Sequence, residues 1–189
     1  IKKWKSSVVM KIQEIKTKVF KQSIKNKDTI KERLLVWFNK EPVVGFGTNY
    51  NISKTDWNKS FDMKRDYVKY LLTEFTPYIN NIGEVLKTEK CSIFDMWYQQ
   101  YENNDNHEWH NHGLTNWANI YFVELPNKTG TEFLDFIIDD IKEGDLLTFP
   151  AYLMHRSPTN KSNERKTIVS FNSNYTDYKE HWQFTIYSI

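Results

Sequence analysis

The chain has a single cysteine, Cys91, and no continuous apolar run near the length of a membrane span. One thiol can neither close a disulfide within the chain nor build a thiolate metal site alone, so we expect Cys91 to be a buried structural residue. The first residues are basic but lack an apolar core followed by small residues, and the chain has no internal repeat or low-complexity tract. These absences predict a soluble, cytoplasmic protein without a membrane partner.

What the chain does contain is enough apolar surface for a packed core. Apolar residues make up 39% of the 189 positions and aromatic residues 16%, which predicts one domain over residues 1–189. The net charge is only +2, but residues 1–40 carry +9 and residues 41–189 carry −7. No aromatic-interleaved motif accompanies the basic segment, so a solvated helical face is favoured over a nucleic-acid or acidic partner.

Residues 1–90 have the spacing of helices. Apolar residues recur every three to four positions in three segments, which predicts helices near residues 8–19, 30–38 and 67–85. Pro77 lies inside the third segment and predicts a bend there. We therefore expect a mainly helical support region in this half of the chain.

From residue 91 onward the sequence has the composition of short strands. Runs rich in Ile, Val, Phe, Tyr and Thr alternate with Asn, Gly, Pro and Asp. The predicted strands are 91–101, 116–124, 131–137, 145–149, 152–156, 165–173 and 182–188. Strands that follow helices, with no helices between them, predict an α+β fold in which a double-stranded β-helix, also called a jelly roll and cupin-like, is buttressed by N-terminal helices.

Three of the five histidines lie in the stretch "HEWHNHG". His110 and His112 are one residue apart, so on an extended segment both imidazoles project from the same face and can bind one metal ion. His107 is expected outside this pair, as a neighbouring or surface residue. The zinc-protease pattern His-Glu-x-x-His fails, because position 111 is Asn. A His-x-His pair alone needs a third ligand.

The third ligand is predicted at His155, at the end of the short strand "AYLMH". Arg165 follows ten residues later and offers a planar, permanently charged fork suited to a carboxylate. Thr167 shares its face of the strand. The combined pattern predicts a metal site beside a carboxylate site.

Residues 91–174 resemble the Fe(II)- and 2-oxoglutarate-dependent dioxygenases, in particular the prolyl-hydroxylase-like branch. The resemblance rests on "YENNDNHEWHNH", "NIYFVELP" and "EGDLLTFPAYLMHRSPTN" with "ERKTIVSFN". It implies that Fe(II) is held by the three ligands His110, His112 and His155, and that no other residue is catalytic. It also implies a 2-oxoglutarate site formed by Arg165, Thr167, Tyr101 and Tyr121. Tyr121 belongs to the more polar face of segment 117–123, which we expect to point toward the site.

The resemblance implies a reaction and leaves alternatives open. An unidentified small molecule or peptide would be hydroxylated with dioxygen, 2-oxoglutarate would be decarboxylated to succinate, and ascorbate could serve as reductant. The family usually has Asp or Glu where this chain has His112, and Asp105 or Glu108 could supply that carboxylate. The alternatives are a cupin-like three-histidine metalloenzyme that does not use 2-oxoglutarate, and a non-catalytic binding module. The oligomeric state is not indicated.

Overall fold

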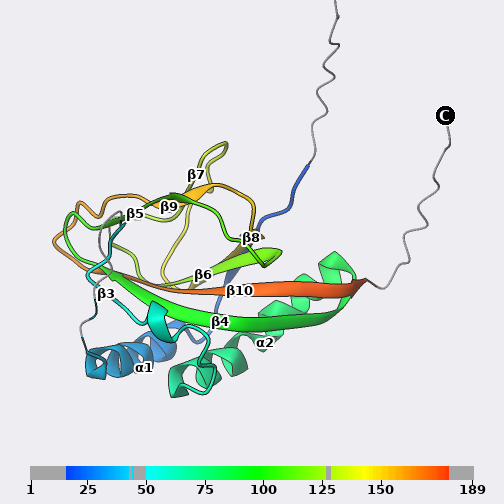
Figure 1. Cartoon of the computed structure of the whole chain (residues 1–189), viewed down its shortest axis with the longest axis horizontal. Helices are drawn as coiled ribbons and strands as arrows, with labels where there is room; N and C mark the ends of the chain where they lie inside the picture. The colour runs from blue at the N-terminus through cyan, green and yellow to red at the C-terminus, as the bar shows by residue number, and fades with distance from the viewer. Residues whose placement is uncertain (1–15, 43, 45–49, 127–128, 179–189) are drawn as a thin grey trace, which may run out of the picture.

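The computed structural model describes residues 16–42, 44, 50–126 and 129–178 (Figure 1). Within these residues the elements follow in the order β1 (Phe20–Ser23), α1 (Lys27–Lys40), β2 (Tyr50–Asn51), β3 (Lys54–Thr55), the 3-10 helix η1 (Trp57–Lys59), α2 (Asp66–Leu86), β4 (Thr88–Tyr101), β5 (Asn106–His110), β6 (Trp117–Glu124), β7 (Glu132–Phe133), β8 (Asp145–Pro150), β9 (His155–Ser157) and β10 (Lys166–Tyr178). No described helix has the length and apolar character that crossing a membrane requires.

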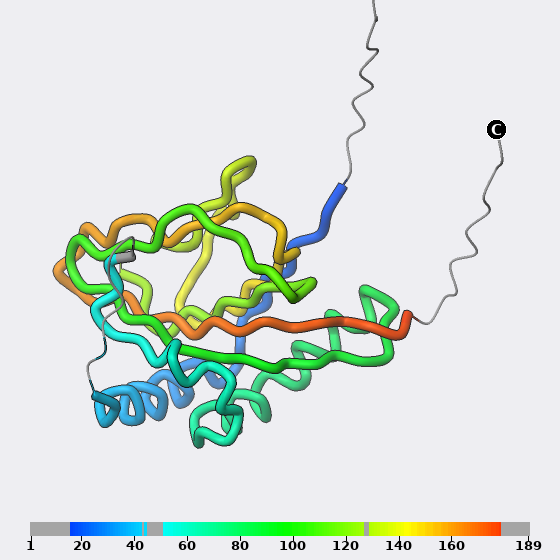
Figure 2. Tube along the Cα trace, in the orientation of Figure 1, coloured from blue at the N-terminus to red at the C-terminus, as the bar shows by residue number. Residues whose placement is uncertain are grey.

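The strands form two antiparallel sheets. The large sheet has six strands in the order β1-β8-β6-β10-β4-β3, and the small sheet has four in the order β2-β5-β9-β7. Both helices cover one face of the large sheet, and the small sheet lies over the other face (Figure 1). In Figure 2 the segments that carry β5 and β9 run side by side above the large sheet.

The helices form because their apolar residues fall on one face. In α1 the buried residues Ile30, Leu34 and Phe38 are four positions apart, so they make one stripe against the sheet. Phe75 of α2 packs on Tyr121 of β6, with ring centroids 5.1 Å apart, and on Phe171 of β10 at 5.8 Å. This packing holds α2 against one face of the large sheet.

A second apolar cluster lies on the other face of the large sheet. Its members include Ile120 and Phe122 of β6, Phe149 of β8 and Ile168 of β10. Strand β6 is therefore buried on both faces, which is why nearly all of its residues are buried. The expectation that the more polar face of segment 117–123 points toward the site is wrong, because Trp117 and Tyr121 pack in the cluster formed with the helices.

Much of the predicted element order is confirmed. The helices expected near 30–38 and 67–85 are α1 and α2, with Pro77 inside α2, and four predicted strands match β4, β6, β8 and β10. The predicted strands 131–137 and 152–156 shrink to β7 and to β9, which begins only at His155.

Other expectations differ from the structure. Strands β1, β2, β3 and β5 were not predicted, and both helices lie between strands. The predicted helix 8–19 lies outside the described residues up to position 15, and the predicted strand 182–188 lies outside them entirely. Cys91 is exposed, so the expected buried thiol is wrong.

Candidate metal centre

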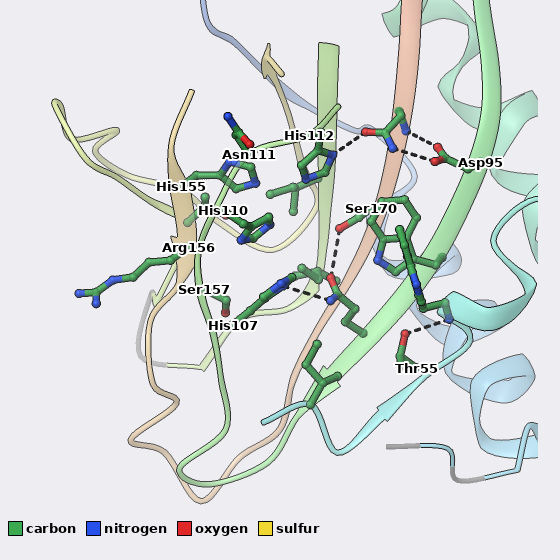
Figure 3. A pocket seen from close by; sticks show the side chains of 18 of the residues that line it. Thr55, Asp95, His107, His110, Asn111, His112, His155, Arg156, Ser157 and Ser170 are labelled. Carbon is green, nitrogen blue, oxygen red and sulfur yellow. Dashed lines mark hydrogen bonds between the residues drawn. The ribbon is translucent and has the colours of Figure 1, made fainter. Parts of the chain in front are cut away.

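Three histidines meet where the small sheet faces the large one. His110 ends β5, His155 begins β9, and the two are direct partners across the antiparallel pair. His112 lies two residues beyond β5, where its backbone N–H donates to the Ala151 carbonyl at 2.9 Å. One nitrogen from each of these three imidazoles lies within 4.8 Å of the others, so the structure brings together the three predicted ligands (Figure 3).

Backbone carbonyls determine which nitrogen of two of these rings is available. His110 Nδ1 lies 2.7 Å from the Glu108 carbonyl oxygen, and His155 Nδ1 lies 2.9 Å from the Leu153 carbonyl oxygen. A carbonyl only accepts, so Nδ1 carries the proton and Nε2 keeps its lone pair. Burial lowers the pKa of His110 to about 4 and that of His155 to about 2, which keeps both rings neutral. Neutral imidazole is the form that binds metal.

His112 hydrogen-bonds through Nδ1 to a side chain, whereas His110 and His155 hydrogen-bond to backbone carbonyls. Its Nδ1 lies 2.6 Å from Asn172 Oδ1, and the Asn172 amide nitrogen donates to Asp95 Oδ2 at 2.8 Å. Burial lowers the pKa of His112, and the hydrogen bond that His112 donates to Asn172 opposes this shift. Burial raises the pKa of Asp95, and the hydrogen bonds that Asp95 accepts from Asn172 oppose that shift. Three neutral imidazole nitrogens directed at one point fit a divalent first-row metal such as Fe(II).

His107 also lines this cavity, as a neighbour of His110 that lies outside the group of three ligand atoms. Its ring stacks on His110 with centroids 3.9 Å apart. In the antiparallel pair, His107 lies opposite Ser157 and His110 lies opposite His155. Strand β5 therefore has one more residue between these two positions than β9 has. That extra residue is a β-bulge, which turns two side chains three positions apart toward the same side. A regular alternation in the sequence would place them on opposite faces, so periodicity gave no signal for His107.

The histidines line a cavity of about 510 Å³ between the sheets. Its outer part is apolar and exposed, with Trp57, Phe61 and Leu114 at 40%, 72% and 98% exposure. Its inner part contains the buried polar residues Tyr101 and Ser157. The volume is in the range of small-molecule sites.

Lys166 lies behind the inner part of this cavity, in contact with the lining residues Ser157 and Tyr101. Its side chain is fully buried, and Nζ donates to Ser157 Oγ at 2.9 Å and to the Gly130 carbonyl at 3.2 Å. Nζ also lies 5.7 Å from the ring centre of Tyr101. Burial lowers the pKa of Lys166 to about 7, while it raises the pKa of Tyr101 so that the phenol keeps its proton. A buried ammonium, a phenol and a hydroxyl can together bind an anion.

Three predicted cosubstrate residues lie elsewhere. Arg165 donates from Nε and from its terminal nitrogen to the two carboxylate oxygens of Glu124, at 2.9 and 3.1 Å. Thr167 donates to the same carboxylate, and Tyr121 packs against the helices. Strand alternation explains this placement, because residues 165 and 167 share the helical face of the sheet while Lys166 points inward. Of the predicted cosubstrate residues, the structure places Tyr101 in the cavity.

The two carboxylates that could have supplied a ligand beside His112 are engaged elsewhere. Asp105 Oδ2 accepts the backbone N–H of Glu102 at 2.8 Å and that of Ser53 at 3.1 Å. Glu108 accepts from the Asn106 amide at 2.6 Å, on an exposed part of β5. Neither belongs to the group of ligand atoms around His110, His112 and His155.

Solved structures share this fold. A viral collagen prolyl hydroxylase of Paramecium bursaria Chlorella virus 1, in complex with 2-oxoglutarate, aligns with a TM-score of 0.64 and 15% identity over 84% of this chain and 96% of its own. The α-ketoglutarate-dependent epimerase SnoN from nogalamycin biosynthesis aligns with a TM-score of 0.66 and 14% identity over 85% and 78%. The chain has the fold of the 2-oxoglutarate-dependent oxygenases.

Other comparisons bear on the same fold. HygX from Streptomyces hygroscopicus, with nickel and 2-oxoglutarate bound, aligns with a TM-score of 0.63 and 8% identity over 85% of this chain and 84% of its own. No family model and no curated protein matches the chain. At these identities the likeness establishes the fold of the oxygenases, and the chemistry has to be argued from the site.

Proposed function

We propose that the protein is an Fe(II)- and 2-oxoglutarate-dependent oxygenase that hydroxylates its substrate. The observation that carries this proposal is a pair of features, three neutral imidazoles directed at a common point in one cavity and a buried lysine that contacts Ser157 in the lining of that cavity. We infer that the two sheets are the halves of a double-stranded β-helix in a single domain. Ferrous iron held there would supply dioxygen activation, coupling decarboxylation of 2-oxoglutarate to succinate with hydroxylation.

His110, His112 and His155 would hold the metal through Nε2, and Lys166 would bind the far carboxylate of 2-oxoglutarate. Ser157 and Tyr101 would donate hydrogen bonds to the same carboxylate. Because the pKa of Lys166 is lowered to about 7, an arriving anion would favour its protonated form. Lys166 takes the role that the sequence suggested for Arg165.

The outer part of the cavity would receive the substrate. Trp57, Phe61 and Leu114 leave large apolar surfaces exposed there. Among the described lining residues, the charged side chains are already engaged, Asp95 with Asn172 and Arg156 with Glu132 at 2.7 Å. A small molecule or peptide that presents an apolar group to the metal fits this surface.

Lys166 also favours this proposal over the alternatives. A three-histidine metalloenzyme that does not use 2-oxoglutarate has no need of a buried cation beside its metal. A non-catalytic binding module would not need three imidazoles with their Nε2 atoms unprotonated. Burying an ammonium without a carboxylate partner is costly, so a bound anion is its natural complement.

The test is turnover of 2-oxoglutarate by the purified protein with Fe(II) and ascorbate. We expect slow succinate formation even without a substrate, and loss of that activity in Lys166→Met with iron still bound. Iron bound in a 1:1 ratio without binding of 2-oxoglutarate would contradict the proposal and favour the metalloenzyme that does not use it. Binding of both without succinate would favour the non-catalytic module.

A further inference from the structure

A buried carboxylate lies behind His112, one side chain away from it. Asp95 of β4 and Asn172 of β10 are direct partners across the large sheet. Asp95 Oδ1 accepts the backbone N–H of Asn172 at 2.9 Å, and Oδ2 accepts the amide side chain at 2.8 Å. Figure 3 draws these bonds together with the one from His112. Asp95 is only 3% exposed, although it lines the cavity of the histidines.

The hydrogen bond between Asp95 and Asn172 determines which group donates in the hydrogen bond between Asn172 and His112. An ionised Asp95 only accepts, so the Asn172 amide must turn its NH₂ group toward it. Asn172 Oδ1 then faces His112, and an oxygen there requires the proton on Nδ1. The lone pair of His112 is therefore on Nε2, the nitrogen that a metal would use. The negative charge of Asp95, acting through the one intervening side chain of Asn172, therefore determines the tautomer of His112.

The same carboxylate affects the charge of the centre. Three neutral imidazoles leave a divalent ion with its full +2, whereas two imidazoles and one carboxylate leave +1. We propose that Asp95 acts through Asn172 as the positioning residue of the metal centre, setting the His112 tautomer and supplying the negative charge that no ligand carries. This inference rests on the metal site of the proposed function and not on its use of 2-oxoglutarate.

The tautomer can be measured without any metal. Long-range proton–nitrogen NMR spectra of the metal-free protein should show the proton of His112 on Nδ1. In Asp95→Asn, one Asn faces another and the Asn172 amide is free to turn over, so we expect a mixture of tautomers or Nε2–H. A wild-type His112 that carries its proton on Nε2 would overturn the proposal without any variant.

Metal affinity gives the second measurement, with Co(II) as the probe in anaerobic calorimetry. We expect Asp95→Asn to weaken Co(II) binding by about 10- to 100-fold, the usual effect of losing such an outer partner. The exchanged pair Asp95→Asn with Asn172→Asp should recover most of this loss. In that pair Asp at 172 accepts from His112 directly, and Asn at 95 accepts the backbone N–H of residue 172 and donates to the new carboxylate.

Asp56→Asn is the matched control, because Asp56 is also a buried aspartate that accepts a backbone N–H of β4, from Tyr98 at 2.9 Å. It should lower the melting temperature without changing Co(II) affinity. Wild-type affinity in Asp95→Asn, or an exchanged pair no better than the single variant, would overturn the proposal. Tight Co(II) binding without 2-oxoglutarate turnover would contradict the proposed function and leave the role of Asp95 standing.

Discussion

Arg165 and Lys166 are adjacent in the chain, but their side chains lie on opposite faces of the large sheet. The Arg165 guanidinium pairs with Glu124, whereas Lys166 Nζ donates to Ser157 Oγ at the inner end of the histidine cavity. Arg165 therefore has its carboxylate within the protein, whereas the hydrogen bonds of Lys166 to the described residues go to neutral groups, the Ser157 hydroxyl and the Gly130 carbonyl. In the proposed function, the cation that would bind the carboxylate of 2-oxoglutarate is therefore Lys166.

Replacing Lys166 with Met should weaken 2-oxoglutarate binding by about 10- to 100-fold, since a hydrogen bond to a charged group contributes about 1.5–3 kcal/mol. Metal affinity should change little, because Lys166 is not among the proposed ligands. Isothermal titration with 2-oxoglutarate and Co(II) measures both. Arg165→Met is the control and should leave the 2-oxoglutarate affinity within about threefold. A larger loss of 2-oxoglutarate affinity in Arg165→Met than in Lys166→Met would show that Arg165 binds the carboxylate instead.

The sequence predicted the three converging histidines, two from their local spacing and His155 from the end of a predicted strand, although in the structure His155 begins β9. It could not choose between Arg165 and Lys166. Both faces of β10 are buried, so hydrophobic alternation does not say which face points inward. The inward face is the more polar one in β10, with Ser170 and Asn172, but the more apolar one in β6, with Ile120.

Other parts of the site depend on pairing between strands. His107 reaches the cavity through a β-bulge, and Asp95 reaches Asn172 through the register of β4 with β10. Residues 95 and 172 are 77 positions apart. Neither the bulge nor the register leaves a pattern in a single sequence, because both are set by the packing of the two sheets.

The buried Lys166 should make the stability of the metal-free protein depend on pH. Its pKa is lowered from 10.5 to about 7 by burial, so between these values the unfolded chain binds a proton that the folded chain does not. Stability should therefore rise as pH increases from about 7 to about 10.5, and the cost of the buried charge is fully present below pH 7. Urea unfolding at several pH values measures this rise. Lys166→Met should lack it, and an equal rise in that variant would assign it to other groups.

The same shift predicts that 2-oxoglutarate binding at pH 8 takes up a proton. Free Lys166 is mostly neutral at that pH, whereas an ammonium beside a carboxylate is stabilised. Calorimetry in two buffers with different ionisation enthalpies would give different apparent binding enthalpies, and the difference reports the protons taken up. Identical enthalpies in both buffers would show that Lys166 is already charged before binding.

His155 and His107 should respond differently to the same substitution. His155 is in the group of converging ligand atoms, and His107 stacks on His110 outside it. His155→Phe should remove detectable Co(II) binding, because two imidazoles remain, while His107→Phe should keep the affinity within about tenfold as a changed neighbour of a ligand. Anaerobic titration followed by the visible spectrum of Co(II) measures both. Equal losses in the two variants would make His107 a fourth ligand.

Arg65 should be a main stabilising residue of the segment that joins η1 to α2. Its guanidinium pairs with Asp56, and it donates to the Ser60 carbonyl at 3.2 Å and to the Tyr67 hydroxyl at 2.8 Å. Both charged side chains are nearly buried, at 11% and 4% exposure. Arg65→Met would leave a buried carboxylate without its cation, which should lower the free energy of unfolding by about 3–5 kcal/mol.

The pH dependence of this loss identifies its cause. Burial raises the pKa of Asp56, and Arg65 lowers it, so removing Arg65 should raise it further. A carboxyl whose pKa is higher in the folded state than in the unfolded state gains stability as pH falls, so the deficit of Arg65→Met should be smaller at pH 5 than at pH 8. Adding Asp56→Asn should remove that pH dependence. A deficit that is the same at both pH values would assign the loss to the hydrogen bonds with Ser60 and Tyr67 instead of to the buried charge.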